Sequence, residues 1–132
     1  RGQDGFHIYL WIMKDLSWVQ AWYWSGLIFG TLTLTWSSFM LWRACSRKSL
    51  DEVWTHSAQF MWLFGNFLWM QGELHDNQYP NEPSIYNQRA DQAGYIFIAA
   101  LIWISIYYCI AKPLNITSSR EVNAPYDTTG FK

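Results

Sequence analysis

The sequence predicts an all-α integral membrane protein, in which three transmembrane helices follow a short interfacial helix and precede an extended C-terminal tail. Of its 132 residues, 51% are hydrophobic and 20% are aromatic. Charged residues make up 14%, well below the roughly 25% that is usual in soluble domains. Three segments are apolar over ~17–25 residues, the length of a helical bilayer crossing. A chain of this length suits a single membrane domain, residues 1–132.

The first expected element is an interfacial helix over residues 6–18. This segment is strongly apolar but contains Lys14 and Asp15, and these charges favour a helix that lies along the membrane surface. The alternative is a long, tilted helix that begins at Phe6 and continues into the membrane. It would bring Lys14 and Asp15 toward lipid, which is costly.

The three expected spans are residues 19–42, 53–71 and 94–111, and the first and third contain no charged residue. Within the first span, small residues recur at spacings of three and four, which predicts close packing against another helix. These residues are Gly26, Gly30, Thr33 and Ser37. The polar segment 112–132 is expected to have no core of its own and to dock on a partner protein.

Loop charges predict the orientation of the chain. The first loop carries Arg43, Arg47 and Lys48, whereas the second is mainly acidic. Since positively charged loops stay on the cytoplasm-equivalent side, the first loop and the C-terminus are expected on the stromal or matrix side of an organelle membrane, either thylakoid or mitochondrial inner. A first residue other than Met would fit a targeting segment removed on import. The net charge of −1, without a basic stripe, argues against nucleic-acid binding.

The second span carries a polar stripe, which is defined here as His56, Gln59, Asn66 and Glu73. Their spacing, with Leu63 and Met70 between them, places these residues on one helical face. Such a face must meet protein, water or a ligand rather than lipid. We expect it to hydrogen-bond to neighbouring helices, and the alternatives are a proton or ion relay and ligation of a pigment or haem by His56.

One partner is expected for the end of the stripe. Glu73 lies near the same membrane interface as Lys14, which predicts a Lys14–Glu73 ion pair that joins the interfacial helix to the second span. We therefore expect Lys14 to have a structural role, together with the residues of the polar stripe. His56, Gln59 and Asn66 are also candidate contacts for chlorophyll, carotenoid or lipid.

The remaining reactive residues match no catalytic or metal-binding motif, so we expect neither an enzyme nor a metal site. Glu73, His75 and Asp76 lie close together in sequence, but their spacing fits no standard zinc or di-iron pattern. Cys45 and Cys109 are expected near the same side of the membrane, where conditions are normally reducing.

Two segments carry a resemblance to a family. One is Lys14-Asp15-Leu16-Ser17-Trp18, and the other closes the second span with Asn66-Phe-Leu-Trp69-Met70-Gln-Gly-Glu73. Over about half its length the chain resembles a group of small, uncharacterised three-span membrane proteins. The resemblance implies that the Lys-Asp pair and the Asn–Glu stripe belong to one structural unit, and it implies no activity.

These features favour a non-catalytic subunit of a large energy-transducing membrane complex, photosynthetic in preference to respiratory, with other membrane subunits as partners. Trp62 and Trp103 are expected at mid-membrane, where they should pack against helices or a flat ligand. A small homo-oligomeric transporter that uses the polar stripe is the alternative. A membrane enzyme for a quinone or lipid, with Glu73 and His75 in one pocket, is a third hypothesis.

Overall fold

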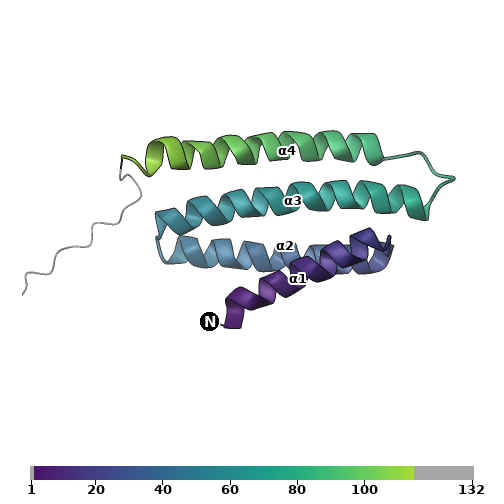
Figure 1. The fold of residues 1–132 in the computed structure, drawn as a ribbon, viewed down its shortest axis with the longest axis horizontal. Coiled ribbons are helices and arrows are strands. Elements are labelled where there is room, and N and C mark those ends of the chain that lie inside the picture. Colours follow the sequence, from purple (N-terminus) through teal and green to yellow (C-terminus); the bar gives the residue numbers. More distant parts are fainter. Residues whose placement is uncertain (1, 115–132) are drawn as a thin grey trace, which may run out of the picture.

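The computed structural model describes residues 2–114, with side chains from residue 5, and this part of the chain is all-helical, as predicted. Three long antiparallel helices lie in one row, with α3 in the middle, and α1 crosses α2 obliquely on one side of the row (Figure 1). The tail expected to dock on a partner falls almost entirely outside the described residues. The elements are α1 (Gly2–Val19), α2 (Tyr23–Ser46), α3 (Leu50–Gln78), α4 (Tyr86–Ile106) and a π-helical end, η1 (Tyr107–Ala111).

The chain turns sharply between α1 and α2, so the two are separate helices. Ala21 has a φ of 54°, in the left-handed region, which ends the regular helix. The helix expected over residues 6–18 is therefore a distinct element, longer at its start than predicted, and the single long helix considered as its alternative is wrong. Its position at a membrane interface stays a prediction. The helix after it starts at Tyr23, four residues later than the predicted span.

The middle helix is longer than the predicted span of residues 53–71. Asp51 and Glu52 lie in its first turn, where carboxylates interact favourably with the helix dipole. At its other end α3 continues through the polar residues 75–78, and it stops just before Pro80. α4 similarly begins eight residues before the predicted third span.

Small residues set the distance between α2 and α3. The four small residues predicted as a packing line are all buried, and the prediction is confirmed. A methyl group on Gly30 would lie 2.6 Å from Phe67 Cδ2, and one on Gly26 would lie 2.7 Å from Leu74 Cδ1. The side chains of α3 therefore fill the space that these glycines leave.

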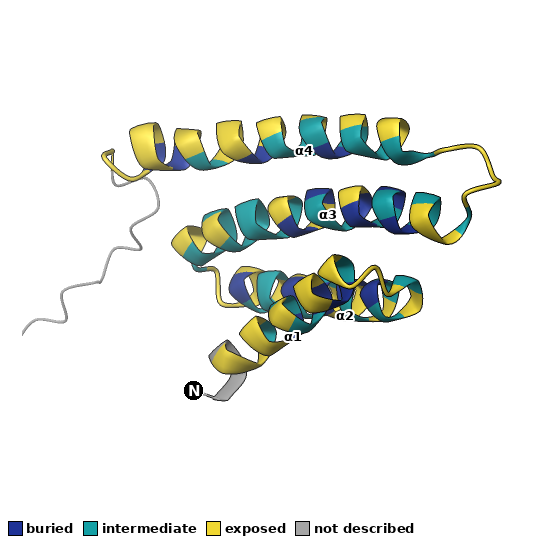
Figure 2. Ribbon diagram, turned by 45° about the vertical axis from the view of Figure 1, so that its right-hand side comes forward, coloured by how far each residue is buried: buried dark blue, intermediate teal, exposed yellow. Residues whose placement is uncertain are grey.

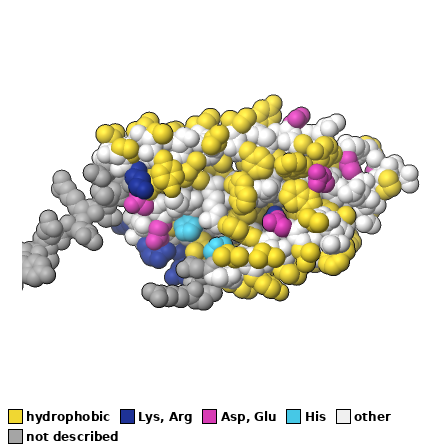
Figure 3. Space-filling model, in the orientation of Figure 1, with side chains coloured by type: hydrophobic (Ala, Val, Ile, Leu, Met, Phe, Trp, Pro, Cys, Tyr) yellow, Lys and Arg dark blue, Asp and Glu magenta, His cyan; other side chains and the backbone are white. Residues whose placement is uncertain are grey.

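The outer surface is largely apolar. On α4 the exposed residues lie on the side away from α3 (Figure 2), and hydrophobic side chains cover much of the face drawn in Figure 3. In the described part of the chain, one helix is long and apolar enough to cross a membrane by composition, Tyr86–Ala111, which joins α4 and η1. α2 carries more Ser, Thr and Trp, and α3 carries more Trp and amide side chains. These residues lower the mean hydropathy of both helices, so three spans are not confirmed.

Candidate functional site

The polar stripe of α3 does not form one continuous path. His56 and Gln59 face a small cavity between α1, α2 and α3. Asn66 lines a groove on the side of α4, whereas Glu73 contacts α1. The residues share a face of α3, as their spacing predicts, but each part of that face meets a different neighbour.

Glu73 is held by a tryptophan of α1 rather than by a lysine. Trp18 Nε1 donates to Glu73 Oε2 over 2.5 Å. Lys14 is 4% exposed, pairs with the adjacent Asp15, and lies 5.4 Å from the centre of the Trp18 ring. The predicted Lys14–Glu73 ion pair is therefore wrong, because the Trp18 side chain lies at the place where the two charges were expected to meet. Both charged groups contact the same indole instead.

Two tryptophan pairs join α1 to α3. The Trp11 and Trp62 ring centres are 5.9 Å apart, as are those of Trp18 and Trp69, and both pairs meet edge to face. Within each helix the two tryptophans are seven residues apart, so the contacts repeat every two turns and the helices run in the same direction. Sequence reasoning missed these pairs, although the matching seven-residue spacing was a readable signal.

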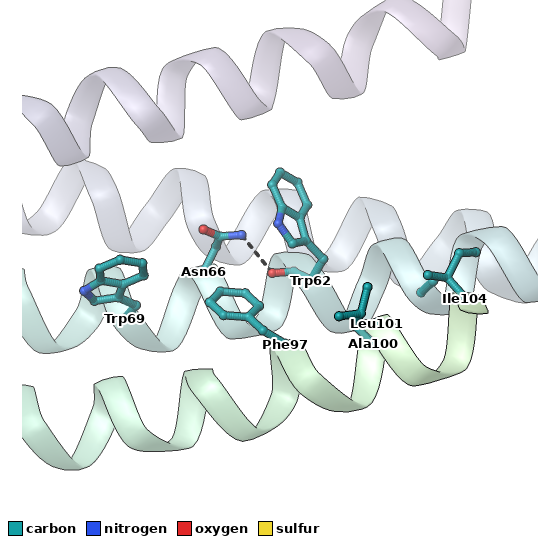
Figure 4. A pocket seen from close by; sticks show the side chains of 8 residues that line it. Trp62, Asn66, Trp69, Phe97, Ala100, Leu101 and Ile104 are labelled. Carbon is teal, nitrogen blue, oxygen red and sulfur yellow. Dashed lines mark hydrogen bonds between the residues drawn. The ribbon is translucent and has the colours of Figure 1, made fainter. Parts of the chain in front are cut away.

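A groove of about 500 Å³ lies between α3 and α4. Figure 4 shows Trp62, Asn66 and Trp69 on α3 facing this space, with Phe97 and Leu101 contributed by α4. Asn66 Nδ2 donates to Trp62 O over 2.9 Å, a bond within its own helix. Within the described residues, the Asn66 carbonyl oxygen and second N–H are available to a molecule in the groove. The residues lining the groove are Ala58, Trp62, Asn66, Trp69, Phe97, Ala100, Leu101 and Ile104.

A second aromatic cluster joins α3 to α4 near the first loop. Trp54 and Trp103 stack with ring centres 4.1 Å apart, and Trp103 Nε1 donates to Ser57 Oγ over 2.7 Å. Tyr107 donates to Asp51 Oδ1 over 3.1 Å. Trp103 thus packs against a helix, one of the two roles predicted for it. The Ser57 and Asp51 partners were missed, because only the register between α3 and α4 brings them near.

The cluster that follows Glu73 organises a loop. Asp76 accepts hydrogen bonds from the Ser84 hydroxyl and, over 3.0 Å, from the Ile85 amide. The Ser84 bond is the main cause that holds the pKa of the Asp76 carboxyl below its ordinary value. His75 Nε2 lies 3.5 Å from Glu82 Oε2. Asp76 thereby fastens the end of α3 to the start of α4.

The same geometry separates the groups that an enzyme site would need. Glu73 contacts Trp18 on α1, whereas His75 faces Asp76 and Glu82 beside the loop. No group of three or more His, Cys, Asp or Glu side chains is placed to hold a metal ion within residues 5–114. Cys45 and Cys109 are both exposed and not disulfide-bonded. Glu73 and His75, which the membrane-enzyme hypothesis placed in one pocket, therefore have different partners.

Comparison with known protein families, with curated proteins and with solved structures found no match. The resemblance carried by residues 14–18 and 66–73 stays a prediction.

Proposed function

We propose that this chain is a non-catalytic subunit of a larger membrane complex, in which α2, α3 and α4 cross the bilayer and α1 lies against them. The three helices have 24, 29 and 21 residues, and each can cover the ~20 residues of a bilayer core. More large apolar side chains are exposed than buried in the described part of the chain. Apolar patches beyond a few hundred Å² are rare on soluble monomers, so this exterior favours lipid and protein neighbours.

Loop chemistry supports the three-span arrangement. The basic first loop and Lys112 lie at one end of the row of helices, and the end of α3 with Asp76 and the following loop with Glu82 lie at the other (Figure 1). This is the charge asymmetry expected of loops on opposite sides of a membrane.

A labelling experiment tests the crossings. Single-cysteine variants of the full chain in sealed vesicles are treated with a membrane-impermeant maleimide, at native Cys45, at Asn81→Cys and at Pro113→Cys. Three spans place Cys45 and position 113 on one side and position 81 on the other. If α4 alone crosses the membrane, positions 45 and 81 label from the same side, and the three-span arrangement is refuted.

One observation carries the assignment as a subunit: the amide of Asn66, near the middle of α3, faces an open groove. It lies between Trp62 and Trp69, which are 48% and 36% exposed, and its only hydrogen bond within the described residues is to its own helix. An amide turned toward lipid leaves polar groups unpaired, which is unfavourable in hydrocarbon. A partner helix or a bound ligand with polar atoms would satisfy it.

Copurification of the native assembly tests this assignment. Asn66→Leu is expected to weaken association with unlike subunits, whereas Asn77→Leu, the same change at an exposed position at the end of α3, should leave it intact. Equal recovery of partners with both variants would contradict a partner at the groove. An assembly that contains copies of this chain alone would favour the homo-oligomeric transporter instead.

The proposed setting is an energy-transducing complex, photosynthetic in preference to respiratory. The flat aromatic walls of the groove and the Asn66 amide suit the edge of a chlorophyll or carotenoid ring system. His56 and Gln59 do not share this role in the proposal, because their cavity of about 80 Å³ is well below the ~300 Å³ at which small-molecule sites begin. Absorption spectra and subunit identities of the purified complex test the setting, and a complex without pigment would exclude the photosynthetic alternative.

A further inference from the structure

A small, largely enclosed cavity lies where α1, α2 and α3 meet, apart from the α3–α4 groove. Its volume is about 80 Å³. Its walls carry imidazole, amide, hydroxyl and indole groups. In the membrane setting of the proposed function, this is an unusual density of polar side chains between helices. The lining residues are His7, Trp11, Thr33, Trp36, Ser37, Met40, His56 and Gln59.

Two of the lining residues, His7 and Trp36, each have a buried side-chain nitrogen. Neither His7 Nδ1 nor Trp36 Nε1 has a hydrogen-bond partner among the described residues. The indole N–H of Trp36 can only donate, so an acceptor is required. Leaving such a group unpaired costs about 1–3 kcal/mol, and in a bilayer no outside solvent reaches it.

The volume and the lining select the occupant. A water molecule occupies ~30 Å³ in the liquid and needs two to four polar partners, so a cavity of about 80 Å³ holds roughly two or three molecules. We propose that the cavity binds an internal water cluster that connects His7 of α1, Trp36 of α2 and Gln59 and His56 of α3. The cluster satisfies the orphaned indole N–H and imidazole nitrogen, and it fastens the first half of α1 to the other two helices.

Nuclear magnetic resonance of the full chain, labelled with ¹⁵N at tryptophan and held in lipid nanodiscs, tests the proposal directly. The Trp36 indole proton is expected to show cross-relaxation with long-lived water. Trp103, whose indole N–H donates to Ser57, serves as the control and should show none. Absence of a water signal at Trp36 would overturn the proposal.

A matched pair of substitutions gives an independent test. The direction in which the unfolding equilibrium constant changes distinguishes a cavity that holds water from an empty one. Gln59→Leu keeps the side-chain size but removes a polar partner of the water, so the unfolding equilibrium constant should rise about two- to tenfold relative to Gln71→Leu. Gln71 lies on the same helix outside the cavity. In a dry cavity the apolar side chain would be preferred, and a lower constant for Gln59→Leu would overturn the proposal.

A metal ion is the rival occupant, because His7, His56 and the Met40 thioether line the same space. Titration with Zn²⁺ or Cu⁺ is expected to leave thermal stability unchanged. A stabilisation that saturates with the ion and disappears in His7→Phe would replace the water assignment by a metal site.

Discussion

Gly72→Ala probes a close approach of α3 and α4. A methyl group at this position would lie 2.9 Å from Arg89 Cβ and 3.3 Å from Tyr86 Cα. These atoms are part of α4 or next to its backbone, so no side-chain rotation relieves the overlap and the helices must move apart. Overpacking of this kind costs about 1–3 kcal/mol, while Ala is favoured over Gly in a helix by about 1 kcal/mol. The expected net loss in the free energy of unfolding is therefore about 0–2 kcal/mol.

Gly94→Ala is the matched control, since nothing lies within 4 Å of a methyl group there. It should gain about 1 kcal/mol from helix propensity alone. The propensity gain cancels between the two variants, so their difference of about 1–3 kcal/mol isolates the packing at Gly72. Equilibrium unfolding by sodium dodecyl sulfate in mixed micelles, followed by the helical circular-dichroism signal, measures this difference. Equal stabilities would refute the close α3–α4 contact.

Three further predictions test the contacts around this core. Trp18→Phe removes the N–H that Glu73 accepts and should lower the free energy of unfolding by about 1.5–3 kcal/mol, the usual contribution of a hydrogen bond to a charged group; unchanged stability in the same assay would contradict the bond. Because the folded pKa of Asp76 is lowered, its contribution to the free energy of unfolding is complete above its unfolded pKa of about 3.9 and is lost as the pH falls through the folded pKa. The NMR chemical shift of the Ile85 amide should follow this titration. A chemical shift that changes mainly above pH ~4 would show that another group titrates. Trp103→Phe should lower the free energy of unfolding by only about 0.5–1.5 kcal/mol, because ring stacking is retained; a larger loss would show that the indole fills space that a phenyl ring cannot.

The sequence was informative where the signal is local. Hydrophobic runs predicted helices in the right order, and the spacing of Gly26 to Ser37 predicted the face of α2 that packs closely. The helix ends were less accurate, because a membrane-length criterion does not register a helix that continues through polar residues, as α3 does through residues 75–78. The break before α2 depends on a left-handed Ala21, a residue type that carries no turn signal.

The candidate site was predicted as a face but not as a set of contacts. The four residues of the polar stripe cover an arc of roughly 100° around the axis of α3. When helices are packed side by side, an arc of that width can face more than one neighbouring helix. Whether a position on it meets α1 or opens into the groove depends on where α1 lies, which no local pattern encodes. The reach of a tryptophan side chain decided the outcome for Glu73, since the Trp18 indole extends to the carboxylate that Lys14 was expected to pair with.

The position of α1 explains why the stripe is shielded on one side only. A row of three helices leaves both broad sides of its middle member open, and α1 covers one of them through the Trp11–Trp62 and Trp18–Trp69 contacts. Glu73 and the cavity at His56 and Gln59 lie on that covered side, where protein groups or internal water can satisfy them. Asn66 lies at the edge that α1 does not cover, and the part of the chain that the structure describes has no further helix to place there. The proposed partner at the groove would therefore do for Asn66 what α1 does for Glu73.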